Sequence, residues 1–580
     1  MEDNVFLKKT ALKTWNYFSD NSLKHTNFLP PDNIQVFSKN KIAPYTSISN
    51  IGFYLISCYT AYELKFITLG ELIERSQAVI ESLVKMERFR GHFYNWYDLK
   101  TLRASRPMYV STVDSGNLMA VFVVLTEGFR LIDKEYEFND MLLEGLITHL
   151  ELISEYSSEF DKYFSKKFQE IRNELKTEVK NIGKLVEFFH KITLLVTNAV
   201  SASKNLSQSI KKEAARLYDL HQAILYELEA FYPDKPEHVH DELLEVIERI
   251  DSSQNLLELE ENILLAINHL NRQESVDQNY FDRLKKSYEY IQDKKKRIIT
   301  MADWFEAVFK DIDFSFLYNK KLKALSIGYK SIQKKAEKYH YQTLASESRL
   351  AVFLAIAKNN ISFEAWSGLN RHTRQGKKGP FIVSWSGTMF EYFMPDIFMK
   401  CASNSIYIQT YLNYLEEQKE FSRKKGIPWG LSESCYYSFN KDKEYKYKAF
   451  GIASAALDPN VNEKPVVSAY STFLAMRHDL KGALENLKRI AKDGGTGEYG
   501  FFESIDYSSG EPKVVRTYMS HHQGMILGSL CNILKDNKLI KLFHLNIEVK
   551  SIEYVLEENK SGPVTLPEID IQNKENLIYK

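Results

Sequence analysis

Apolar and polar positions repeat along most of the chain with the period of an amphipathic helix. In the segments 72–86, 142–156, 213–231 and 242–250, apolar residues recur at spacings of three and four. Residues at these spacings lie on one face of an α-helix, so the pattern predicts helices that bury one side. Nearly the whole chain is therefore expected to be helical, and the fold class is expected to be all-α.

The stretch 134–300 differs in composition from its flanks. Gly and Pro are scarce there, while Glu and Lys are frequent, as in long amphipathic helices with solvated faces. We therefore expect 134–300 to be an inserted helical region. The flanks, 1–133 and 301–560, are expected to form one domain together. The polar, aperiodic stretch 561–580 is expected to be a C-terminal linker.

The flanks alternate helical stretches with loops rich in Trp, Tyr, Gly, Ser and carboxylates, for example at 91–98 and 384–387. On a helical scaffold, such loops are where a functional site is expected. Residues 313–328 alternate apolar and polar positions and predict a short β-hairpin.

Charge and composition exclude several functions. The chain has 76 Lys and Arg against 76 Asp and Glu, so nothing electrostatic favours nucleic acid or an anionic membrane as partner. No phosphate-binding or serine-hydrolase motif follows a predicted strand, so nucleotide binding and serine hydrolysis are not supported.

Cysteine usage and the apolar runs bear on the compartment. The four cysteines show no regular spacing, which favours a reducing environment without disulfides. The N-terminus lacks the basic and apolar regions of a signal peptide. The apolar runs 51–58 and 118–125 are shorter than the roughly 20 residues of a membrane span. We expect a soluble, cytosolic fragment that does not itself insert into a membrane.

Carboxylates in aromatic, Gly-containing loops point to glycosidic chemistry. That chemistry usually needs two acids, because one protonates the leaving oxygen and the other attacks the anomeric carbon or activates water. Nearby rings exclude water and raise the pKa of the acid member. The candidates are Glu347, Glu391, Glu433, Glu498, Glu503 and Asp506. For any one of them alone, helix capping or an ion pair is the alternative.

The adjacent residues His521 and His522 are candidate metal ligands by type. Neighbours on a helix point in different directions, however, and no other His or Cys lies at ligand spacing. We therefore expect no metal and no cofactor, and we interpret this pair as hydrogen-bonding partners for sugar hydroxyls.

Seven loop segments carry a resemblance when they are taken in order. They are LPPDN at 29–33, GHFYNWY at 91–97, YVSTVDSGNL at 109–118, LASESRLA at 344–351, SWSGTMFEY at 384–392, PWGLSES at 428–434 and YMSHHQGM at 518–525. Together they resemble the middle, glycoamylase-like domain of bacterial cyclic β-1,2-glucan synthases, which is related to endo-β-1,2-glucanases. The resemblance covers nearly the whole chain, although 134–300 carries no recognised motif.

The resemblance implies an (α/α)6 barrel and an anomer-retaining transglycosylase that closes linear β-1,2-glucan into rings. By position, Glu433 would be the nucleophile and Glu347 the general acid/base, with Glu391 and Glu503 as reserves. It also implies a larger parent protein, with a glycosyltransferase domain and a phosphorylase-like domain, on the cytoplasmic side of the inner membrane.

Substrate-binding residues are predicted from the same loops. Rings expected to stack on glucose units are Tyr94, Trp96, Trp385, Tyr392, Trp429 and Tyr436. Expected partners for hydroxyl groups are Asp114, Glu391, Arg516, His521, His522 and Gln523. For each ring taken alone, a place in the core is the alternative.

Three other functions stay open at this point. The same barrel can hydrolyse β-1,2-glucan with water, since retaining and inverting enzymes differ in carboxylate separation, about 5–5.5 Å against 6.5–9.5 Å. A non-catalytic module would hold glucan for neighbouring domains. A helical scaffold would bind a partner protein through 134–300.

Overall fold

A computed structural model of the chain describes residues 2–37, 41–155, 181–203, 207–233, 241–272 and 277–558, with the single residues 166, 167, 170, 173 and 235. They divide into two compact units. The first comprises 1–12, 58–77 and 128–303, and the second comprises 13–57, 78–127 and 304–580. The expected linker 561–580 lies outside the described residues, and the expected domain boundaries stay a prediction.

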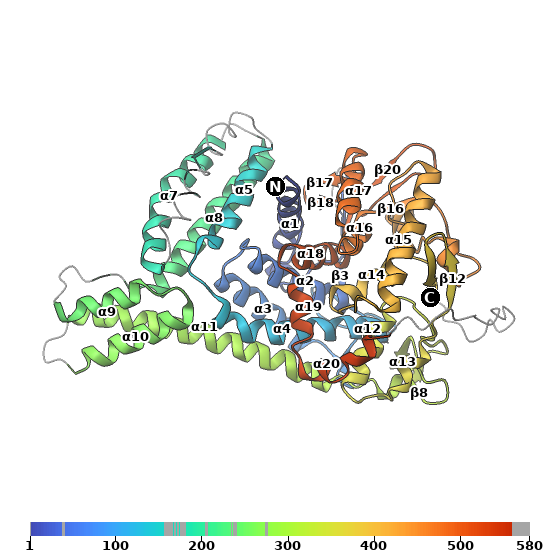
Figure 1. The fold of residues 1–580 in the computed structure, drawn as a ribbon, viewed down its shortest axis with the longest axis horizontal. Helices are drawn as coiled ribbons and strands as arrows, with labels where there is room; N and C mark the ends of the chain where they lie inside the picture. Colours follow the sequence, from blue (N-terminus) through green and yellow to red (C-terminus); the bar gives the residue numbers. More distant parts are fainter. Residues whose placement is uncertain are drawn as a thin grey trace. The chain divides into compact units, whose positions relative to one another are not determined.

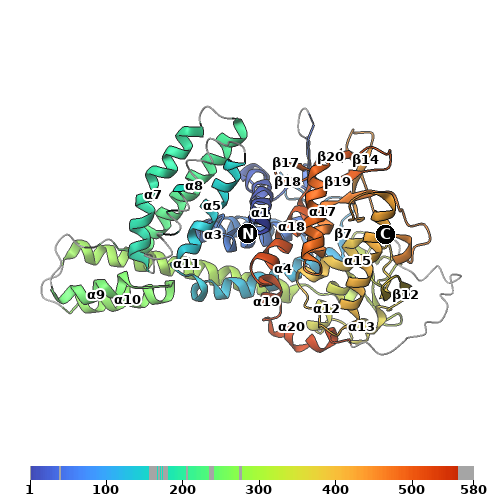
Figure 2. The same cartoon turned by 45° about the horizontal axis from the view of Figure 1, so that its top comes forward.

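Among its described residues, the first unit contains five amphipathic helices besides parts of longer ones. They are α5 (Glu144–Ser154), α7 (Ile182–Ser203), α8 (Gln208–Phe231), α9 (Asp241–Asp251) and α10 (Leu256–Leu270). Helices α5 and α7 both pack on α8, and α9 packs on α10 (Figures 1 and 2). Ser207 begins α8 by accepting the N–H of Ile210, and Asn255 begins α10 by accepting the N–H of Glu258. The helices predicted at 213–231 and 242–250 are confirmed.

In the described part of the second unit, six helices begin within about five residues of a short extended segment. Four of them follow strands: α2 (Ile48–Glu63) after β3 (Tyr45–Ser47), α4 (Thr112–Glu135) after β7 (Tyr109–Ser111), α16 (Ala469–Ala475) after β16 (Val466–Ser468) and α18 (Ser520–Leu534) after β21 (Thr517–Met519). Helices α12 (Ser348–Ala357) and α14 (Met389–Phe393) follow the bridged residues Leu344 and Ser384. Every residue of α12 and of α16 is buried, as expected for helices at the centre of a unit.

Other helices of this unit are polar on one side. Helix α17 (Leu480–Lys492) buries Leu484, Leu487 and Ile490 while its Lys and Glu face water. Helix α15 (Ile406–Lys425) ends at Gly426, whose φ of 68° lies in the left-handed region that closes helices. The remaining helices are α1 (Glu2–Asn21), α3 (Leu69–Lys85), α11 (Gln278–Asp311), α13 (Glu364–Gly368), α19 (Lys538–Phe543) and α20 (Ile547–Ser551).

The strands are short and antiparallel. The hairpin predicted at 313–328 is confirmed, since β8 (Tyr318–Asn319) pairs with β9 (Ala324–Leu325). Strand β1 (Asn33–Gln35) pairs with β21, and β14 (Ser434–Phe439) pairs with β15 (Tyr445–Lys448). The others are β2 (Lys41–Ile42), β4 (Arg88–Phe89), β5 (His92–Phe93), β6 (Trp96–Asp98), β10 (Gly328–Lys330), β11 (Lys335–Ala336), β12 (Thr373–Gly376), β13 (Gly379–Ile382), β17 (Thr496–Gly497), β18 (Gly500–Phe501), β19 (Ser504–Asp506) and β20 (Lys513–Val515).

Helix α4 contains the apolar run 118–125 and extends it. Among the described residues, it is the one helix whose length and hydropathy meet the requirements of a membrane span. Its apolar window is 83% buried inside the structure, as in the core helices of many proteins.

Candidate active site

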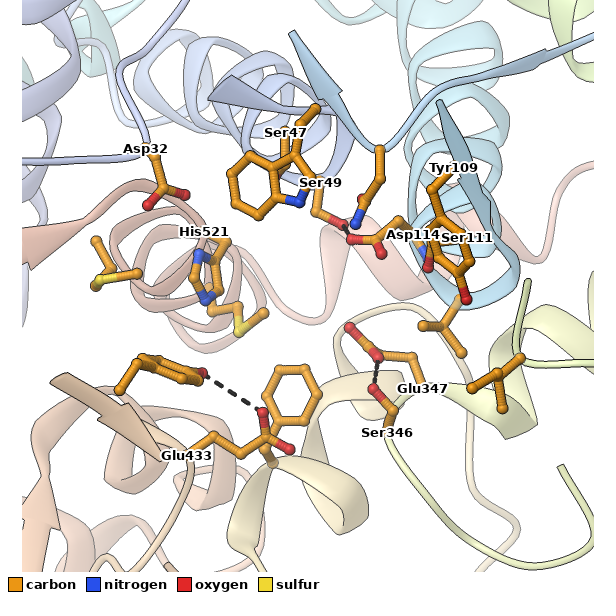
Figure 3. Close-up of a pocket in the computed structure, with 18 of the residues that line it drawn as sticks. Asp32, Ser47, Ser49, Tyr109, Ser111, Asp114, Ser346, Glu347, Glu433 and His521 are labelled. Atoms are coloured by element: carbon orange, nitrogen blue, oxygen red, sulfur yellow. Dashed lines mark hydrogen bonds between the residues drawn. The ribbon is translucent and has the colours of Figure 1, made fainter. Parts of the chain in front are cut away.

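A cavity of about 470 Å³ lies in the second unit, at the beginnings of its central helices (Figure 3). Five of the six helices contribute a lining side chain from the N-cap or the first turn. These residues are Ser49 on α2, Asp114 on α4, Glu347 before α12, Phe390 on α14 and His521 on α18. Helix beginnings carry unpaired N–H groups and partial positive charge, so polar and acidic side chains are favoured there.

Glu347 is the N-cap residue of α12, and its side chain reaches the cavity although only 5% of the residue is exposed. The Asn117 amide donates to Oε1 at 2.8 Å, and the hydroxyl of Ser346 donates to Oε2. Ser346 has a φ of 46°, a strained conformation for a residue other than Gly. Two donors and a strained turn thus fix the direction of this carboxylate.

Glu433 approaches the same cavity from the loop that precedes β14 (Figure 3). It is 7% exposed. The hydroxyl of Tyr447, on β15, donates to its Oε2 at 3.5 Å. The hydroxyl of Tyr470, on α16, donates to its backbone carbonyl at 2.9 Å. The two carboxylates therefore come from separate elements and face one polar space.

Buried titratable groups lie next to Glu433. The Nδ1 atom of His522 is 2.9 and 3.0 Å from the two carboxylate oxygens of Glu503. Burial raises the pKa of Glu503 to about 8 and lowers the pKa of His522 to about 3. Asp32 lines the cavity, and burial raises the pKa of its carboxyl as well. Hydrogen bonds donated by the amides of Asn50 and Asn33 offset part of this rise.

Comparisons with known proteins show what the chain is similar to. Residues 339–546 match the Glycoamylase family model. The chain is 29% identical over 562 residues to the cyclic β-(1,2)-glucan synthase NdvB of Rhizobium meliloti, a match that covers 95% of this chain and 18% of that protein. The chain thus spans about a fifth of the length of this relative.

Solved structures resemble the whole chain. The endo-β-1,2-glucanase of Chitinophaga pinensis superposes with a TM-score of 0.54 at 13% identity, covering 96% of this chain and 98% of that one. The endo-β-1,2-glucanase of Talaromyces funiculosus gives 0.54 at 10% identity, covering 99% and 94%. Residues 339–546 therefore resemble the Glycoamylase family, and the chain as a whole resembles part of the synthase. The resemblance stated from the loops is confirmed, and so is the all-α fold of (α/α)6 type.

The fold brings part of the predicted site together. The predicted residues that line the cavity are Trp96, Asp114, Glu347, Glu433 and His521. The predicted residues that do not line it are Tyr94, Trp385, Glu391, Tyr392, Trp429, Tyr436, Arg516, His522 and Gln523. Contact between any of these residues and a sugar stays a prediction.

Two residues of the loop 384–392 are held inside the protein. Glu391 forms a capping box with Thr388 at the start of α14, and it also accepts the hydroxyl of Ser384 at 2.7 Å. The ring of Tyr392 stacks on Tyr414 with 3.7 Å between centroids. Trp385 is buried as well. For Glu391, the structure corresponds to the alternative of helix capping.

Trp429 lies at a different hollow. This hollow has a volume of about 550 Å³ and is lined mainly by charged residues of α15 and α17. The backbone N–H of Trp429 donates to the Asn486 amide at 2.9 Å, which fixes the loop before Glu433.

The remaining predicted residues have local roles. Gln523 is buried and donates to the carbonyl of Phe501 at 3.2 Å, whereas His522 contacts Glu503. Tyr94 is buried, and Tyr436 packs edge-on against Phe450. Arg516 is exposed, and its carbonyl accepts the N–H of Val36.

Sequence reasoning missed several residues at the cavity. Asp32 and Asn95 line the cavity and lie inside two of the quoted motifs. The motifs could therefore have identified them, but neither residue was among those predicted from these loops. Ser49 donates to Asp114 at 2.7 Å. Tyr447 lies outside every motif, and only the pairing of β14 with β15 brings it to Glu433.

Within the part of the chain that the structure describes, no three His, Cys, Asp or Glu side chains are grouped closely enough to hold a metal ion.

Proposed function

We propose that this chain cleaves linear β-1,2-glucan and joins the cut chain to its own non-reducing end, giving cyclic β-1,2-glucan. The observation that carries the proposal is that Glu347 and Glu433 reach one cavity from separate elements. Similarity to a cyclic β-1,2-glucan synthase and to endo-β-1,2-glucanases supports the choice of substrate.

The proposed reaction has two steps. Glu347 protonates the glycosidic oxygen that leaves, while the Glu433 carboxylate attacks the anomeric carbon and the old bond breaks. Glu347 then removes the proton from the 2-hydroxyl at the other end of the same chain. That oxygen attacks the anomeric carbon, displaces Glu433 and restores both carboxyl groups. One glycosidic bond is broken and one is formed, with no water consumed.

Retention of the anomer follows from the energetics of ring closure. A new β-linkage has to form without an activated donor, so the free energy of the broken bond must be conserved. A covalent glycosyl-enzyme conserves it until the acceptor arrives. Direct attack of water at the anomeric carbon would lose that free energy.

The described rings suit a sugar chain at the cavity. Trp96 lines the cavity, is 38% exposed and meets Tyr45 edge-on with 5.5 Å between centroids. An exposed ring held in place by a neighbour gives a flat apolar face at low entropic cost. We propose that Trp96 stacks on a glucose unit and shields the covalent intermediate from water.

Hydrolysis is the second candidate, because solved structures of this fold are named endo-β-1,2-glucanases. The same two carboxylates would then deliver water in place of the 2-hydroxyl. Access of water to the intermediate decides between the two outcomes.

The parent protein is also part of the proposal. The similar synthase is much longer than this chain. We propose that the chain acts beside a glycosyltransferase domain that makes linear glucan and a phosphorylase-like domain, at the cytoplasmic side of the inner membrane.

The test is to incubate the purified chain with linear β-1,2-glucan and to follow reducing ends and product masses. Products lighter by one water than linear chains of equal length, with no rise in reducing ends, are expected. A steady rise in reducing ends with only linear products would identify a glucanase. No reaction and no binding would overturn both candidates.

A further inference from the structure

Two buried polar side chains lie beside Glu433 and outside the cavity. Glu503 and His522 are 2% and 0% exposed, and neither lines the cavity. Such groups are costly to bury, so a native structure keeps them where they make specific contacts. The Nε2 atom of His522 is buried and has no hydrogen-bond partner among the described residues, so stability alone does not account for this histidine.

The pair is connected to the peptide segment that carries Glu433. One carboxylate oxygen of Glu503 accepts the backbone N–H of Cys435 at 3.2 Å, and the same carboxylate contacts Nδ1 of His522. The Ser504 hydroxyl, next to Glu503 along the chain, donates to the Cys435 carbonyl at 2.5 Å. Residue 435, two positions after Glu433, is thereby held at both of its backbone polar groups.

A second connection runs through Tyr470. Its ring stacks on the His522 ring with 3.6 Å between centroids and 10° between planes. Its hydroxyl donates to the Glu433 carbonyl at 2.9 Å and lies 2.9 Å from the Ser432 hydroxyl. The histidine ring therefore sets the position of the tyrosine that holds the backbone of Glu433.

We propose that Glu503 and His522 are positioning residues for Glu433: together they fix the peptide 432–435 so that the Glu433 carboxylate points into the cavity. The proposal rests on the proposed function for its kinetic test. It assigns to Glu503 a role different from that of a reserve acid, because its carboxylate accepts the N–H of Cys435 and does not line the cavity.

The kinetic test compares Glu503→Ala with Glu503→Gln. The alanine variant removes the bonds to Cys435 and to His522, and we expect kcat to fall at least thirtyfold with KM within threefold. The glutamine side chain can still accept from Cys435 and contact His522, and it is expected to restore kcat to within fivefold of the parent. Glu511→Gln makes the same chemical change at an exposed position and serves as the control.

A milder variant guards against a failure of folding. Tyr470→Phe keeps the stacked ring and removes only the hydroxyl, and kcat is expected to fall about tenfold with little change in melting temperature. The proposal is overturned if Tyr470→Phe and Glu503→Ala both keep kcat within twofold, or if glutamine restores nothing that alanine lost.

A structural measurement separates this proposal from the proposed function. If the parent chain has no activity on β-1,2-glucan, the proposed function fails, and crystal structures of the parent and Glu503→Ala then decide the positioning role. A displaced Glu433 carboxylate in the variant supports it. An unchanged position, with segment 432–435 equally ordered, contradicts it.

Discussion

Each unit of the molecule has a buried carboxylate at the beginning of a helix, and the two differ in what lies beyond it. In the first unit, Glu227 accepts the N–H groups of Leu69 and Gly70 at the start of α3, and the Tyr136 hydroxyl. In the second unit, Glu347 is at the N-cap position of α12, and its side chain lines a cavity of about 470 Å³. The hollow beside Glu227 has a volume of only about 10 Å³.

The comparison shows that burial and position on a helix do not identify a functional acid. Burial raises the pKa of Glu227, as it does for many structural carboxyl groups. What distinguishes Glu347 is space for a substrate and a second carboxylate, Glu433, that reaches the same space. A carboxylate without such space is expected to act on stability alone.

The largest expected effect is on catalysis at the cavity. Replacing Glu347 or Glu433 with Gln is expected to lower turnover of β-1,2-glucan at least a thousandfold, about 4 kcal/mol in the barrier. The free energy of unfolding should change by less than about 1 kcal/mol. Turnover above one tenth of the parent value in either variant would contradict the assignment.

The matching change in the first unit, Glu227→Gln, should lower stability and leave turnover nearly unchanged. In Glu227→Gln an amide N–H faces a backbone N–H or the tyrosine hydroxyl, and an unsatisfied buried group costs about 1–3 kcal/mol. Denaturant titration should show that loss, while turnover stays within twofold. If turnover fell with stability unchanged, the distinction between the two carboxylates would be lost.

A third buried carboxylate, that of Glu503, should make the stability of the protein depend on pH. Because the folded pKa of Glu503 is raised to about 8, the folded protein holds a proton that the unfolded chain has lost above about pH 4.5. The stability contribution of Glu503 is therefore complete below that pH and is lost as pH rises towards 8.

The pKa of His522, lowered to about 3, acts in the opposite direction, with stability lost as pH falls from about 6.5 towards 3. Between pH 6.5 and 8 the glutamate dominates. Over this window the parent should lose at most about 1.4 kcal/mol per pH unit relative to Glu503→Gln. Parallel stability curves for the two proteins would show that Glu503 is ionised throughout.

The smallest expected effect separates two tryptophans. In a catalytically inactive Glu433→Gln background, Trp96→Ala should weaken glucan binding about tenfold, or 1.4 kcal/mol. Trp429→Ala should leave the dissociation constant within twofold, because its ring lies at another hollow. Calorimetry with linear β-1,2-glucan measures both. A larger loss of affinity for Trp429→Ala would show that Trp429 contacts the glucan after all.

Most of the fold could be predicted from the chain because it depends on periodicity. The spacing of apolar residues placed α8 and α9, and alternation placed the hairpin of β8 and β9. The strands that precede the central helices carried no such signal. They have only three residues each, too few for a period of two to be recognised.

The site was predictable as a set of loops and only in part as a set of residues. The motifs located Glu347 and Glu433, but exposure of a ring depends on what packs against it. The ring of Tyr392, predicted to stack on sugar, is covered by Tyr414, which follows it by 414 − 392 = 22 residues. Tyr447 was missed because strand pairing alone brings it to the cavity.

The pairing of β1 with β21 has a consequence for how the protein is made. Asn33 lies opposite Met519, so their partnership spans 519 − 33 = 486 residues. At 5–20 residues per second, a ribosome needs roughly 25–100 s to join them. During that time Asp32 has been synthesised, but the helix that carries His521 has not. A transcript that stops before residue 517 would therefore yield both carboxylates of the pair and no completed cavity.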